Sequence, residues 1–595
     1  MAIRFANCLP SCLALASLTA HAQQFHRVVP LGGERGTRVE VELIGEDLAG
    51  VKEVRLDTPD LVWVETIEAA AKKVRGAIRI APGAALGPHL MHARLPGGRT
   101  NSRLFNVTQF PSVAETEPND PPGKPQRIEL RPQVIHGYME GDIDVDVYEF
   151  EAKAGERWTF EIRSLEYGSH LECELALFDS AGRRTAFNDD RDDYLESPFL
   201  EHTFTKSGVY RLKLDQYRGP QGVECGYNCV YMLEMSQLGS VTAAAPLGAR
   251  PGTSVRVRLM GSGLESIREA WMSPARLAEY YRLTLPYTLP VRTAADRPDP
   301  PRIDGQIERN GTAQIEASFK IPADAPPGVW RIHTRGPRGE ADGINFEISP
   351  AAAIDASLDR AGQEDSYPIE ARAGQPFHAW TLAAQLGLPR IDTVLELFDP
   401  SGKLLAEHDD LMTGQGTVIG NPDSSLYYTP SKDEKLRLVV RDRTGRGGPD
   451  FAYRLHLGTE RPGFQLQTDP EEFTVPRGGE ATLTALLVRE PGFVEGVEVW
   501  VEGLPPGASS GKGSIEANTY FGPSDDGDNV IIPRAAIAIR VPENLTPGDY
   551  PLRVFGKSQG GLVVEAVTTL WIGPKAKRND IRRPVPATTM TVADR

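Results

Sequence analysis

The chain has 595 residues, of which 65 are Lys or Arg and 81 are Asp or Glu, giving a formal net charge of −16. This acidic balance excludes the broad basic surface that binds phosphate backbones, so we predict no nucleic-acid partner. The length predicts roughly three to five domains, and frequent Gly and Pro with few aromatic residues are typical of short strands and turns.

The segment 1–22 has the pattern of a secretory signal peptide. Arg4 supplies a positive charge, Leu9 to Leu18 is largely apolar, and Ala20-His21-Ala22 fits the A-x-A cleavage pattern. We therefore expect cleavage near Ala22 and a secreted or periplasmic mature chain. No later stretch approaches the run of about eighteen apolar residues that a membrane-spanning helix needs.

The predicted mature chain contains three cysteines. Cys225 and Cys229 flank a tight loop and could form a disulfide in an oxidising compartment, but the sequence leaves that pairing open. Cys173 lies in an alternating, strand-like run and is predicted to be a buried, small apolar residue.

Two units of the chain are duplicated. Pro-Leu-Gly, Gly-Thr and a set of alternating apolar residues begin at Pro30 and begin again at Pro246, and the spacing within the two sets is the same. Residues 23–111 and 239–351 are therefore predicted to be copies of one domain. The second copy carries an insertion, in which we predict a short helix from Ser273 to Tyr281.

The units that follow these copies also repeat. Asp146-x-Tyr148 in residues 112–238 matches Asp365-x-Tyr367 in residues 352–459, and a strand with an Asp-x-x-Gly turn follows in both. Residues 460–573 have further short strands at even spacing, which indicate a last β-sandwich. Residues 574–595 are first Lys/Arg-rich and then Pro/Thr-rich, and we predict a disordered tail. The expected fold class is all-β, in tandem β-sandwiches.

Two acidic clusters bracket the start of the second unit. The linker Glu115–Asp120 carries four carboxylate or amide side chains, and Gly141–Phe150 alternates Asp with apolar residues at the spacing of a strand. Two such clusters can close on one hard cation, which takes six to eight oxygen ligands. The alternative is that they are solvated edges of the domain.

The second unit resembles the bacterial pre-peptidase C-terminal domain. This small β-sandwich is found beside secreted peptidases and in the collagen-binding modules of clostridial collagenases. The resemblance covers residues 112–238. The residues that carry it are Glu115-x-Glu117-Pro118-Asn119-Asp120, Asp144-x-Asp146-x-Tyr148-x-Phe150, Ala154-Gly155, Leu175 to Asp179, Gly182, Asp189-Asp190 and Gly208-x-Tyr210.

The resemblance implies a jelly-roll-like sandwich in a bacterial envelope or exterior setting, with calcium as the cofactor. The calcium ligands that it implies are Glu115, Glu117, Asn119, Asp120, Asp142, Asp144 and Asp146. Residues 352–459 lack the acidic linker, so the resemblance gives little reason to expect calcium there. Residues 23–111 and 239–351 resemble immunoglobulin-like domains of the transcription-factor-immunoglobulin (IPT/TIG) type, and residues 460–573 resemble a further secreted immunoglobulin-like module.

No pattern indicates a catalytic residue or an organic cofactor site. Gly507–Gly511 matches G-x-S-x-G, but no helical pattern follows Ser509 as a nucleophile elbow requires. The function that we expect is a non-catalytic binding or scaffolding protein whose partner is an extracellular protein or polysaccharide. Two alternatives stay open: an accessory subunit that targets a separately encoded peptidase or glycosidase, and an enzyme of unrecognised type. The sequence does not indicate an oligomeric state.

Overall fold

The computed structural model describes residues 24–96, 98–120, 124–140, 144–191, 197–216, 228–275, 302–386, 388, 391–409, 423–448, 450–459, 462–490, 492–519, 522–523, 530–531, 533–571, 582–585 and 587–593. They form tandem β-sandwich domains, which confirms the predicted all-β class. Within these residues, no helix is long and apolar enough to cross a membrane. The predicted signal peptide, Asp142 and Cys225 lie outside the described residues.

The first domain packs two sheets around one apolar core. The sheet orders are β1-β3-β6-β5 and β2-β9-β7-β4, with β8 paired to β7. The strands are β1 (Gln24–Val29), β2 (Gly32–Glu34), β3 (Arg38–Glu46), β4 (Glu53–Leu56), β5 (Leu61–Ala70), β6 (Lys73–Ile80), β7 (Gly87–Leu95), β8 (Gly98–Arg99) and β9 (Arg103–Thr108). The alternating residues Val41 and Leu43 of β3 are fully buried in that core, as their spacing predicts.

In the second domain, the chain that enters from the first domain adds one short strand to each of the two sheets. The orders are β10-β12-β19-β14-β17 and β11-β13-β18-β15-β16, and β10 and β11 each pair in parallel with their neighbour. The elements are β10 (Ser112–Ala114), β11 (Gln126–Arg127), β12 (Gln133–Tyr138), β13 (Val145–Ala152), β14 (Arg157–Arg163), η1 (Leu165–Tyr167), β15 (Cys173–Asp179), β16 (Arg184–Asn188), β17 (Phe199–Thr203), β18 (Gly208–Gln216) and β19 (Val230–Ser236). Cys173 is buried in its core, and Cys229 is buried and disulfide-bonded.

The third domain is one eight-stranded sheet in the order β20-β22-β25-β24-β23-β26-β27-β21. Its elements are β20 (Ser240–Ala245), β21 (Gly248–Ala249), β22 (Ser254–Ser262), η2 (Leu264–Ser266), β23 (Glu269–Pro274), β24 (Ile303–Asn310), β25 (Gln314–Lys320), β26 (Gly328–Gly336) and β27 (Gly339–Ile348). The predicted helix is wrong at its start, because Ser273 and Pro274 pair with β26 and continue a strand. The rest of that predicted helix, residues 276–281, lies outside the described residues.

The first and third domains share an irregularity as well as a pattern. A β-bulge between Phe25 and Arg27 in the β1–β3 ladder recurs between Val241 and Ala243 in the β20–β22 ladder. The two bulges stand at the same distance before the Pro-Leu-Gly motif of their own copy. Because a bulge is a specific local device rather than a consequence of composition, its recurrence supports duplication of the whole unit.

The fourth domain repeats the two-sheet arrangement of the second with fewer strands. Its orders are β28-β35-β30-β33 and β29-β34-β31-β32. The elements are β28 (Ala353–Ser357), β29 (Glu364–Ala371), β30 (Phe377–Leu382), η5 (Ala384–Leu386), β31 (Thr393–Phe398), β32 (Leu404–His408), β33 (Ser425–Tyr428), β34 (Glu434–Asp442) and β35 (Ala452–Gly458).

The fifth domain is completed by residues near the end of the chain. Its sheets have the orders β40-β44-β38-β36-β47-β48 and β37-β49-β45-β39-β41, with β46 paired to β45 and a separate β42–β43 pair. The strands are β36 (Phe464–Asp469), β37 (Glu472–Pro476), β38 (Glu480–Arg489), β39 (Val497–Glu502), β40 (Ser509–Ser510), β41 (Gly513–Ile515), β42 (Gly522–Pro523), β43 (Val530–Ile531), β44 (Arg534–Arg540), β45 (Gly548–Ser558), β46 (Val563–Glu565), β47 (Val567–Trp571), β48 (Arg582–Val585) and β49 (Thr588–Ala593).

The prediction that residues 574–595 are a disordered tail is therefore wrong for residues 582–585 and 588–593, whereas residues 574–581 lie outside the described part of the chain. Strand β49 lies between β37 and β45, and its residues Met590 and Val592 are buried in the core of the fifth domain. The sequence does not indicate this strand because it is short and follows a basic, Pro-containing stretch, so its alternating pattern is too brief to recognise. Its partners β37 and β45 are also far from it in the sequence.

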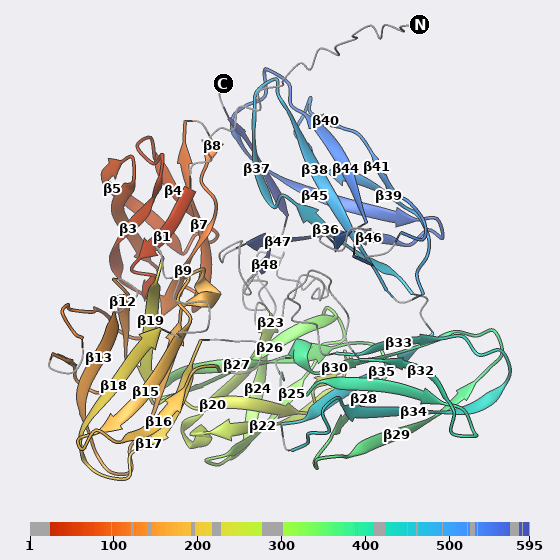
Figure 1. Cartoon of the computed structure of the whole chain (residues 1–595), viewed down its shortest axis with the longest axis horizontal. Helices are drawn as coiled ribbons and strands as arrows, with labels where there is room; N and C mark the ends of the chain where they lie inside the picture. The colour runs from red at the N-terminus through yellow and green to blue at the C-terminus, as the bar shows by residue number, and fades with distance from the viewer. Residues whose placement is uncertain are drawn as a thin grey trace, which may run out of the picture.

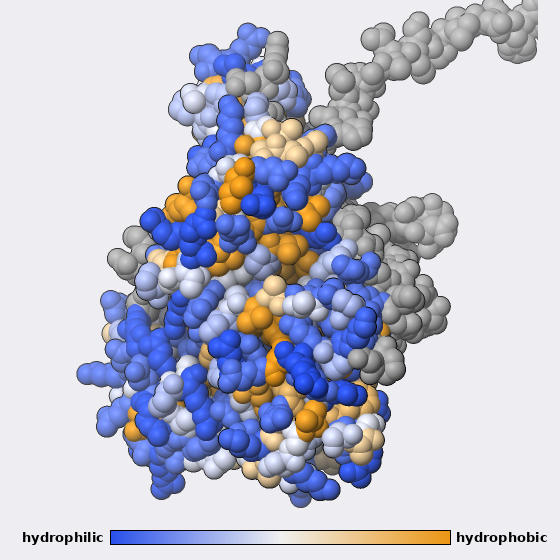
Figure 2. Space-filling view, turned by 90° about the vertical axis from the view of Figure 1, so that its left-hand side faces the viewer, coloured by the Kyte–Doolittle hydropathy of each residue, from blue (hydrophilic) through white to orange (hydrophobic). Residues whose placement is uncertain are grey.

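The five domains form a closed arrangement in which the first and the fifth lie side by side (Figure 1). Figure 2 shows the face that the first and second domains present: it is mostly hydrophilic, with apolar residues in scattered groups. The exposed large apolar residues of the first domain, Val62, Val64 and Ile67, all lie on the edge strand β5.

The burial of β49 predicts that its apolar residues stabilise the fifth domain. Met590 is 0 % exposed, so Met590→Ala should lower the free energy of unfolding of that domain by about 2–5 kcal/mol, as truncations in cores do. Chemical denaturation of the full chain, followed by the signal of the fifth domain, measures this loss. Thr589→Ala, on the half-buried neighbouring position, is the matched control and should change stability much less. Equal, negligible effects of the two substitutions would contradict a structural role for β49.

Candidate functional site

The acidic linker and the strand that carries Asp146 meet at one end of the second domain. Strand β10 pairs with β12, and directly after it the amide of Glu115 donates to the carbonyl of His136 at 3.0 Å. This pairing carries the linker past the start of β13, where Asp144 and Asp146 lie. The parallel pairing of the incoming chain therefore brings together two clusters that are separate in the sequence.

Two tyrosine hydroxyls connect the sheets at this end. The Tyr148 and Tyr231 hydroxyl oxygens are 2.5 Å apart, although Tyr148 lies on β13 and Tyr231 on β19. The Tyr231 oxygen also lies 2.5 Å from Asp146 Oδ2 and 2.9 Å from Glu115 Oε2. One hydroxyl has a single proton to donate, so it cannot serve both carboxylates. Tyr231 can therefore donate to only one of the two carboxylate oxygens that face it.

Gly137 makes room for this contact. A Cβ atom at this position would lie 2.1 Å from Tyr231 Cζ, 2.3 Å from its hydroxyl oxygen and 2.5 Å from Glu115 Oε2. All three distances are far below van der Waals contact, so any larger residue would push Tyr231 and Glu115 apart. The absence of a side chain at residue 137 is therefore a condition for the tyrosine–carboxylate cluster.

Like charges are concentrated where the linker meets β13. One carboxylate oxygen from each of Glu115, Glu117 and Asp146 can lie within 4.8 Å of the others. Burial raises the pKa of Asp146 well above its usual range, and the neighbouring Glu115 carboxylate adds to that rise. Burial also raises the pKa of Glu115, against the hydrogen bonds from Tyr231 and the Tyr138 amide. In both cases the protein disfavours the ionised form unless a positive charge is present.

Several buried polar atoms of the cluster have no partner at normal hydrogen-bond geometry within the described residues, although the Asn119 side chain lies near enough to Asp146 to oppose the rise of its pKa. They are Glu117 Oε1, Asn119 Oδ1, Asn119 Nδ2 and Asp146 Oδ1. Asn119 and Asp146 are both 0 % exposed, so water does not compensate from the surface. Buried polar groups are nearly always hydrogen-bonded, and each exception needs an explanation. Three of these four atoms are oxygens, which is the donor type that a hard cation binds.

The structure brings together most of the seven residues predicted as ligands. Glu115, Glu117, Asn119 and Asp146 form the cluster just described. Asp144 is buried beside it and accepts a hydrogen bond from the Glu140 amide, and the nearby Asp120 charge helps to raise its pKa after burial itself. Asp120 is exposed. Asp142 lies outside the described residues.

The donor set fits a hard divalent cation. It consists of carboxylate and amide oxygens, with no Cys or His among the clustered residues that the structure describes, so soft thiolate-type or imidazole-type coordination is not offered. Hard divalent cations such as calcium take oxygen ligands of this kind. The residues that would hold the ion are those of the linker and of the start of β13.

The fourth domain repeats the tyrosine pair but has a neutral glutamine, Gln363, where the second domain has the carboxylate of Asp144. The Tyr367 and Tyr453 hydroxyls are 2.7 Å apart, and Tyr453 donates to Asp365 Oδ2 at 2.7 Å. The other oxygen of Asp365 accepts from the side-chain amide of Gln363 at 3.0 Å. Gln363 stands two residues before Asp365, as Asp144 stands two residues before Asp146. A neutral donor within the domain therefore completes the hydrogen bonding of the single carboxylate.

Sequence reasoning missed Tyr231 as part of the site. The signal was present in the duplication, because Tyr-x-Leu at residues 231–233 is matched by Tyr-x-Leu at residues 453–455. This repeated tyrosine could have been recognised as the partner of the other repeated tyrosine, which is Tyr148 in the second domain and Tyr367 in the fourth. Its distance of 83 residues from Tyr148 in the chain gave no reason to place the two hydroxyls together.

A second polar arrangement lies on the third domain. Ser273 Oγ and His333 Nε2 are 2.9 Å apart, and His333 Nδ1 lies 3.8 Å from Glu340 Oε1. The last distance is too long for a hydrogen bond, and the other oxygen of Glu340 binds Arg335 at 2.8 Å. The carboxylate is therefore not aligned to orient the imidazole as a catalytic base requires. Ser509 lies in the short strand β40 rather than at a strand-to-helix turn.

Histidines gather on the fourth domain in a ring stack. The rings of Tyr427, His378, Trp380 and His456 stack in that order, with centroids 3.8, 4.4 and 4.7 Å apart. His378 Nε2 lies 2.8 Å from Ser425 Oγ, and His456 Nε2 lies 2.9 Å from Glu347 Oε2 of the third domain. Burial, with smaller effects of the neighbouring His456 and His408, lowers the pKa of His378 to about 4. The stack therefore needs neutral imidazole at His378.

Comparisons with known proteins identify no family. No family model matches the chain, and no curated protein sequence matches it. Among solved structures, a DUF4785 family protein from Legionella pneumophila subsp. pneumophila str. Philadelphia 1 aligns over 55% of this chain and 89% of its own, with 10% identity and a TM-score of 0.17. The I9–I11 tandem of titin aligns over 58% of this chain and 95% of its own, with 8% identity and a TM-score of 0.10.

The buried imidazole predicts a loss of stability in mild acid. The unfolded chain binds a proton at His378 near pH 6.5, whereas the folded chain resists it until about pH 4. Stability is therefore complete above pH 6.5 and falls as the pH drops towards 4, by on the order of 3 kcal/mol from this residue. Denaturation of wild type and His378→Gln at pH 7.5 and 4.5 tests it: the variant should lose less stability between the two. An equal pH dependence would contradict the prediction.

Proposed function

We propose that this chain is a non-catalytic binding or scaffolding protein that acts outside the cytoplasm, and that its second domain binds calcium at the entry linker. The observation that carries the proposal is the meeting of Glu115, Glu117 and Asp146 around buried oxygens that have no partner within the described residues. The signal-like N-terminus supports the location, and an extracellular protein or polysaccharide is the expected partner class.

Calcium would act on the junction between the first and second domains. Asn119 and the two glutamates belong to the linker, whereas Asp146 belongs to β13 of the second sandwich. An ion that binds both would remove the like-charge repulsion and hold the linker on the sandwich. The same junction already contains a shared apolar cluster, which includes Leu31 and Leu104 of the first domain and Val134 and Met232 of the second. The ion would reinforce an interface that apolar packing has formed.

Calcium should stabilise the full chain through Asp146. A ligand that binds only the folded state contributes about 2.7 kcal/mol at one hundred times its Kd, and extracellular calcium modules have Kd values of about 10⁻⁴–10⁻³ M. Calorimetric titration should therefore detect binding by wild type, and millimolar calcium should raise the melting temperature. Asp146→Asn should abolish both responses without lowering the calcium-free stability, because it removes a carboxyl whose ionised form is disfavoured by burial.

Asp365→Asn in the fourth domain is the matched control for this experiment. It removes the corresponding carboxylate in the domain without the acidic linker, so the calcium response should be unchanged. No binding by wild type at millimolar calcium would refute the site. Loss of the calcium response in Asp365→Asn, but not in Asp146→Asn, would show that the ion binds the fourth domain and would contradict the proposed site in the second. Tyr231→Phe should weaken binding, whereas Tyr453→Phe should not.

A non-catalytic function predicts that neither Ser273 nor Ser509 contributes to any hydrolytic activity. Purified protein should hydrolyse neither a p-nitrophenyl ester nor a casein substrate above the background reaction. Ser273→Ala and Ser509→Ala should be indistinguishable from wild type in both assays, since Glu340 is not aligned behind His333 and Ser509 lies in a strand. Activity that disappears in one of these variants would establish an enzyme and overturn the proposal.

A further inference from the structure

Apolar packing divides the five domains into three bodies. One buried apolar cluster joins the first and second domains, and a single continuous cluster extends from Ala243 of the third domain to Leu455 of the fourth. Among the described residues, the main cluster of the fifth domain contains only residues of that domain. Domains that share a core move together, whereas polar contacts between domains resemble transient interfaces. The molecule therefore has a first–second body, a third–fourth body and the fifth domain.

Polar contacts join these bodies where the chain passes between them. Arg157 of the second domain donates to Ser262 of the third at 2.8 Å and to Leu238 O in the connection at 2.8 Å. Tyr427 of the fourth domain donates to Glu490 of the fifth at 2.5 Å. Each of these joints also has a covalent connection through the backbone. The contact between the first and fifth domains instead joins parts of the chain that are far apart in the sequence.

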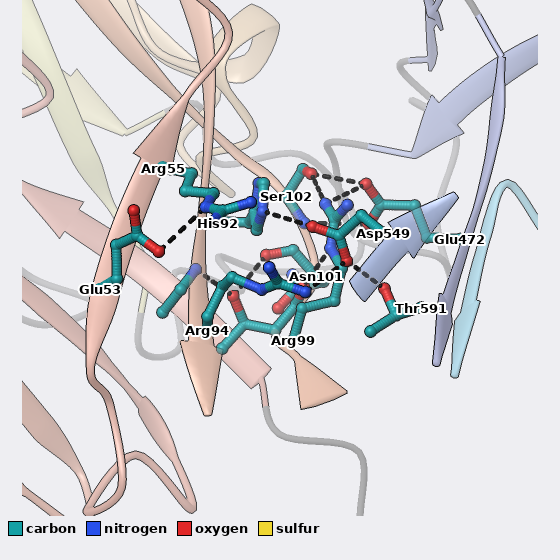
Figure 3. Close-up of polar contacts among 12 residues, drawn as sticks. Glu53, Arg55, His92, Arg94, Arg99, Asn101, Ser102, Glu472, Asp549 and Thr591 are labelled. Atoms are coloured by element: carbon teal, nitrogen blue, oxygen red, sulfur yellow. Dashed lines mark hydrogen bonds and ion pairs between the residues drawn. The ribbon is translucent and has the colours of Figure 1, made fainter. Parts of the chain in front are cut away.

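A hairpin of the first domain makes that closing contact. The hairpin β7–β8 presents Arg99, whose guanidinium donates to Glu472 Oε1 on β37 at 2.6 Å. The Ser102 hydroxyl donates to the same oxygen at 2.6 Å, and the Ser102 amide donates to Glu472 Oε2 at 3.2 Å. Figure 3 shows Glu472, Asp549 and Thr591 of the fifth domain directed towards this hairpin.

Asp549 of β45 forms the second anchor. Arg94 of the first domain lies 3.4 Å from Asp549 Oδ1, and His92 Nε2 lies 3.6 Å from Oδ2. Burial alone would raise the pKa of Asp549, but His92, Thr591 and the two arginines together hold it well below its usual range. The carboxylate is thus ionised and electrostatically favoured in the closed arrangement.

Both halves of the contact are organised within their own domains. The Arg99 guanidinium donates to Ser102 Oγ at 2.7 Å, and Thr591 donates to Asp549 at 2.8 Å. If the domains separated, these bonds would remain and water would replace the others. Opening therefore leaves the polar groups of the contact solvated, and the two states differ mainly in a few charge-assisted hydrogen bonds.

We propose that this contact is a releasable clasp that closes the chain into a ring within one molecule. The clasp consists of His92, Arg94, Arg99 and Ser102 of the first domain with Glu472 and Asp549 of the fifth. In the open state the fifth domain moves about its connection to the fourth. The other two bodies keep their structures because their cores are not shared across the clasp. The one apolar contribution from the fifth domain to the first–second cluster is the partly buried Val585, among the described residues.

Charge reversal in the full chain tests the clasp. Glu472→Arg should open the ring because it places two cations together, and small-angle X-ray scattering should then show a larger maximum dimension at unchanged molecular mass. Arg99→Glu alone should do the same, and the double variant should return the dimension towards that of wild type. The control is the swap of Glu480 and Arg540, an exposed pair within the fifth domain, which should leave the dimension unchanged.

A covalent lock gives an independent measurement. A Cβ atom on Gly98 would lie 3.6 Å from Thr474 Cβ, within the range that a disulfide spans. Oxidised Gly98→Cys/Thr474→Cys should keep Glu472→Arg compact, and reduction should allow it to open. The positive φ of 134° at Gly98 disfavours Cys there, so the pair serves as a trap and not as a measure of stability.

Three results would contradict a contact that closes the ring within one molecule. Unchanged dimensions in both single reversals would overturn it, since the contact would then not hold the ring closed. Opening that the double variant does not reverse would also overturn it, because the effect would come from misfolding of a domain. A doubled mass in wild type would overturn it too, because the same surfaces would then join two copies rather than the ends of one. Calcium binding should be the same in all of these variants, since the clasp residues lie apart from Glu115 and Asp146.

Discussion

Apolar contact across domain boundaries determines how this chain is arranged. Each sandwich buries the inner faces of its own sheets, but two boundaries also bury residues from both neighbours. Those boundaries are fixed by the same force that holds each domain together, at roughly 25 cal/mol for each Å² of apolar surface removed from water. The remaining boundaries depend on hydrogen bonds and ion pairs, whose net contribution is small because water competes for the same groups. The proposed division into three bodies follows from that difference.

The two tyrosine-containing domains share one framework but place different numbers of carboxylates on it. Both place two hydroxyls and one aspartate between their sheets. In the fourth domain the side-chain amide of Gln363 completes the hydrogen bonding of Asp365. In the second domain the linker adds further carboxylates to the same place, and Glu117 Oε1 and Asp146 Oδ1 have no hydrogen-bond donor among the described residues. The difference lies in the short linker segment and in the residue two positions before the aspartate.

Sequence patterns predicted the parts of this structure that depend on local periodicity. Alternating residues such as Val41 and Leu43 identified the strands, and the motif shared by Pro30 and Pro246 identified the first duplication. The meeting of the linker with Asp146 also followed, because both clusters are dense and near each other in the chain. Tyr231 and the strand β49 were missed because their positions depend on partners far away in the sequence. Ser273 was misassigned for a related reason: pairing with β26 overrides a local capping pattern.

The position of β49 has a consequence for the order in which the molecule forms. Within its sheet, β37 has β49 as its neighbour, and the register pairs Glu472 with Thr589. A chain that emerges from its N-terminus can fold the first four domains before residue 589 exists, since domains generally fold as units in order of synthesis. Glu472 then has no ordered strand beside it until residues 588–593 have been synthesised. The clasp consequently forms only after the first four domains, and a chain interrupted before residue 588 would present Arg94 and Arg99 without an ordered β37 to hold Glu472 opposite them.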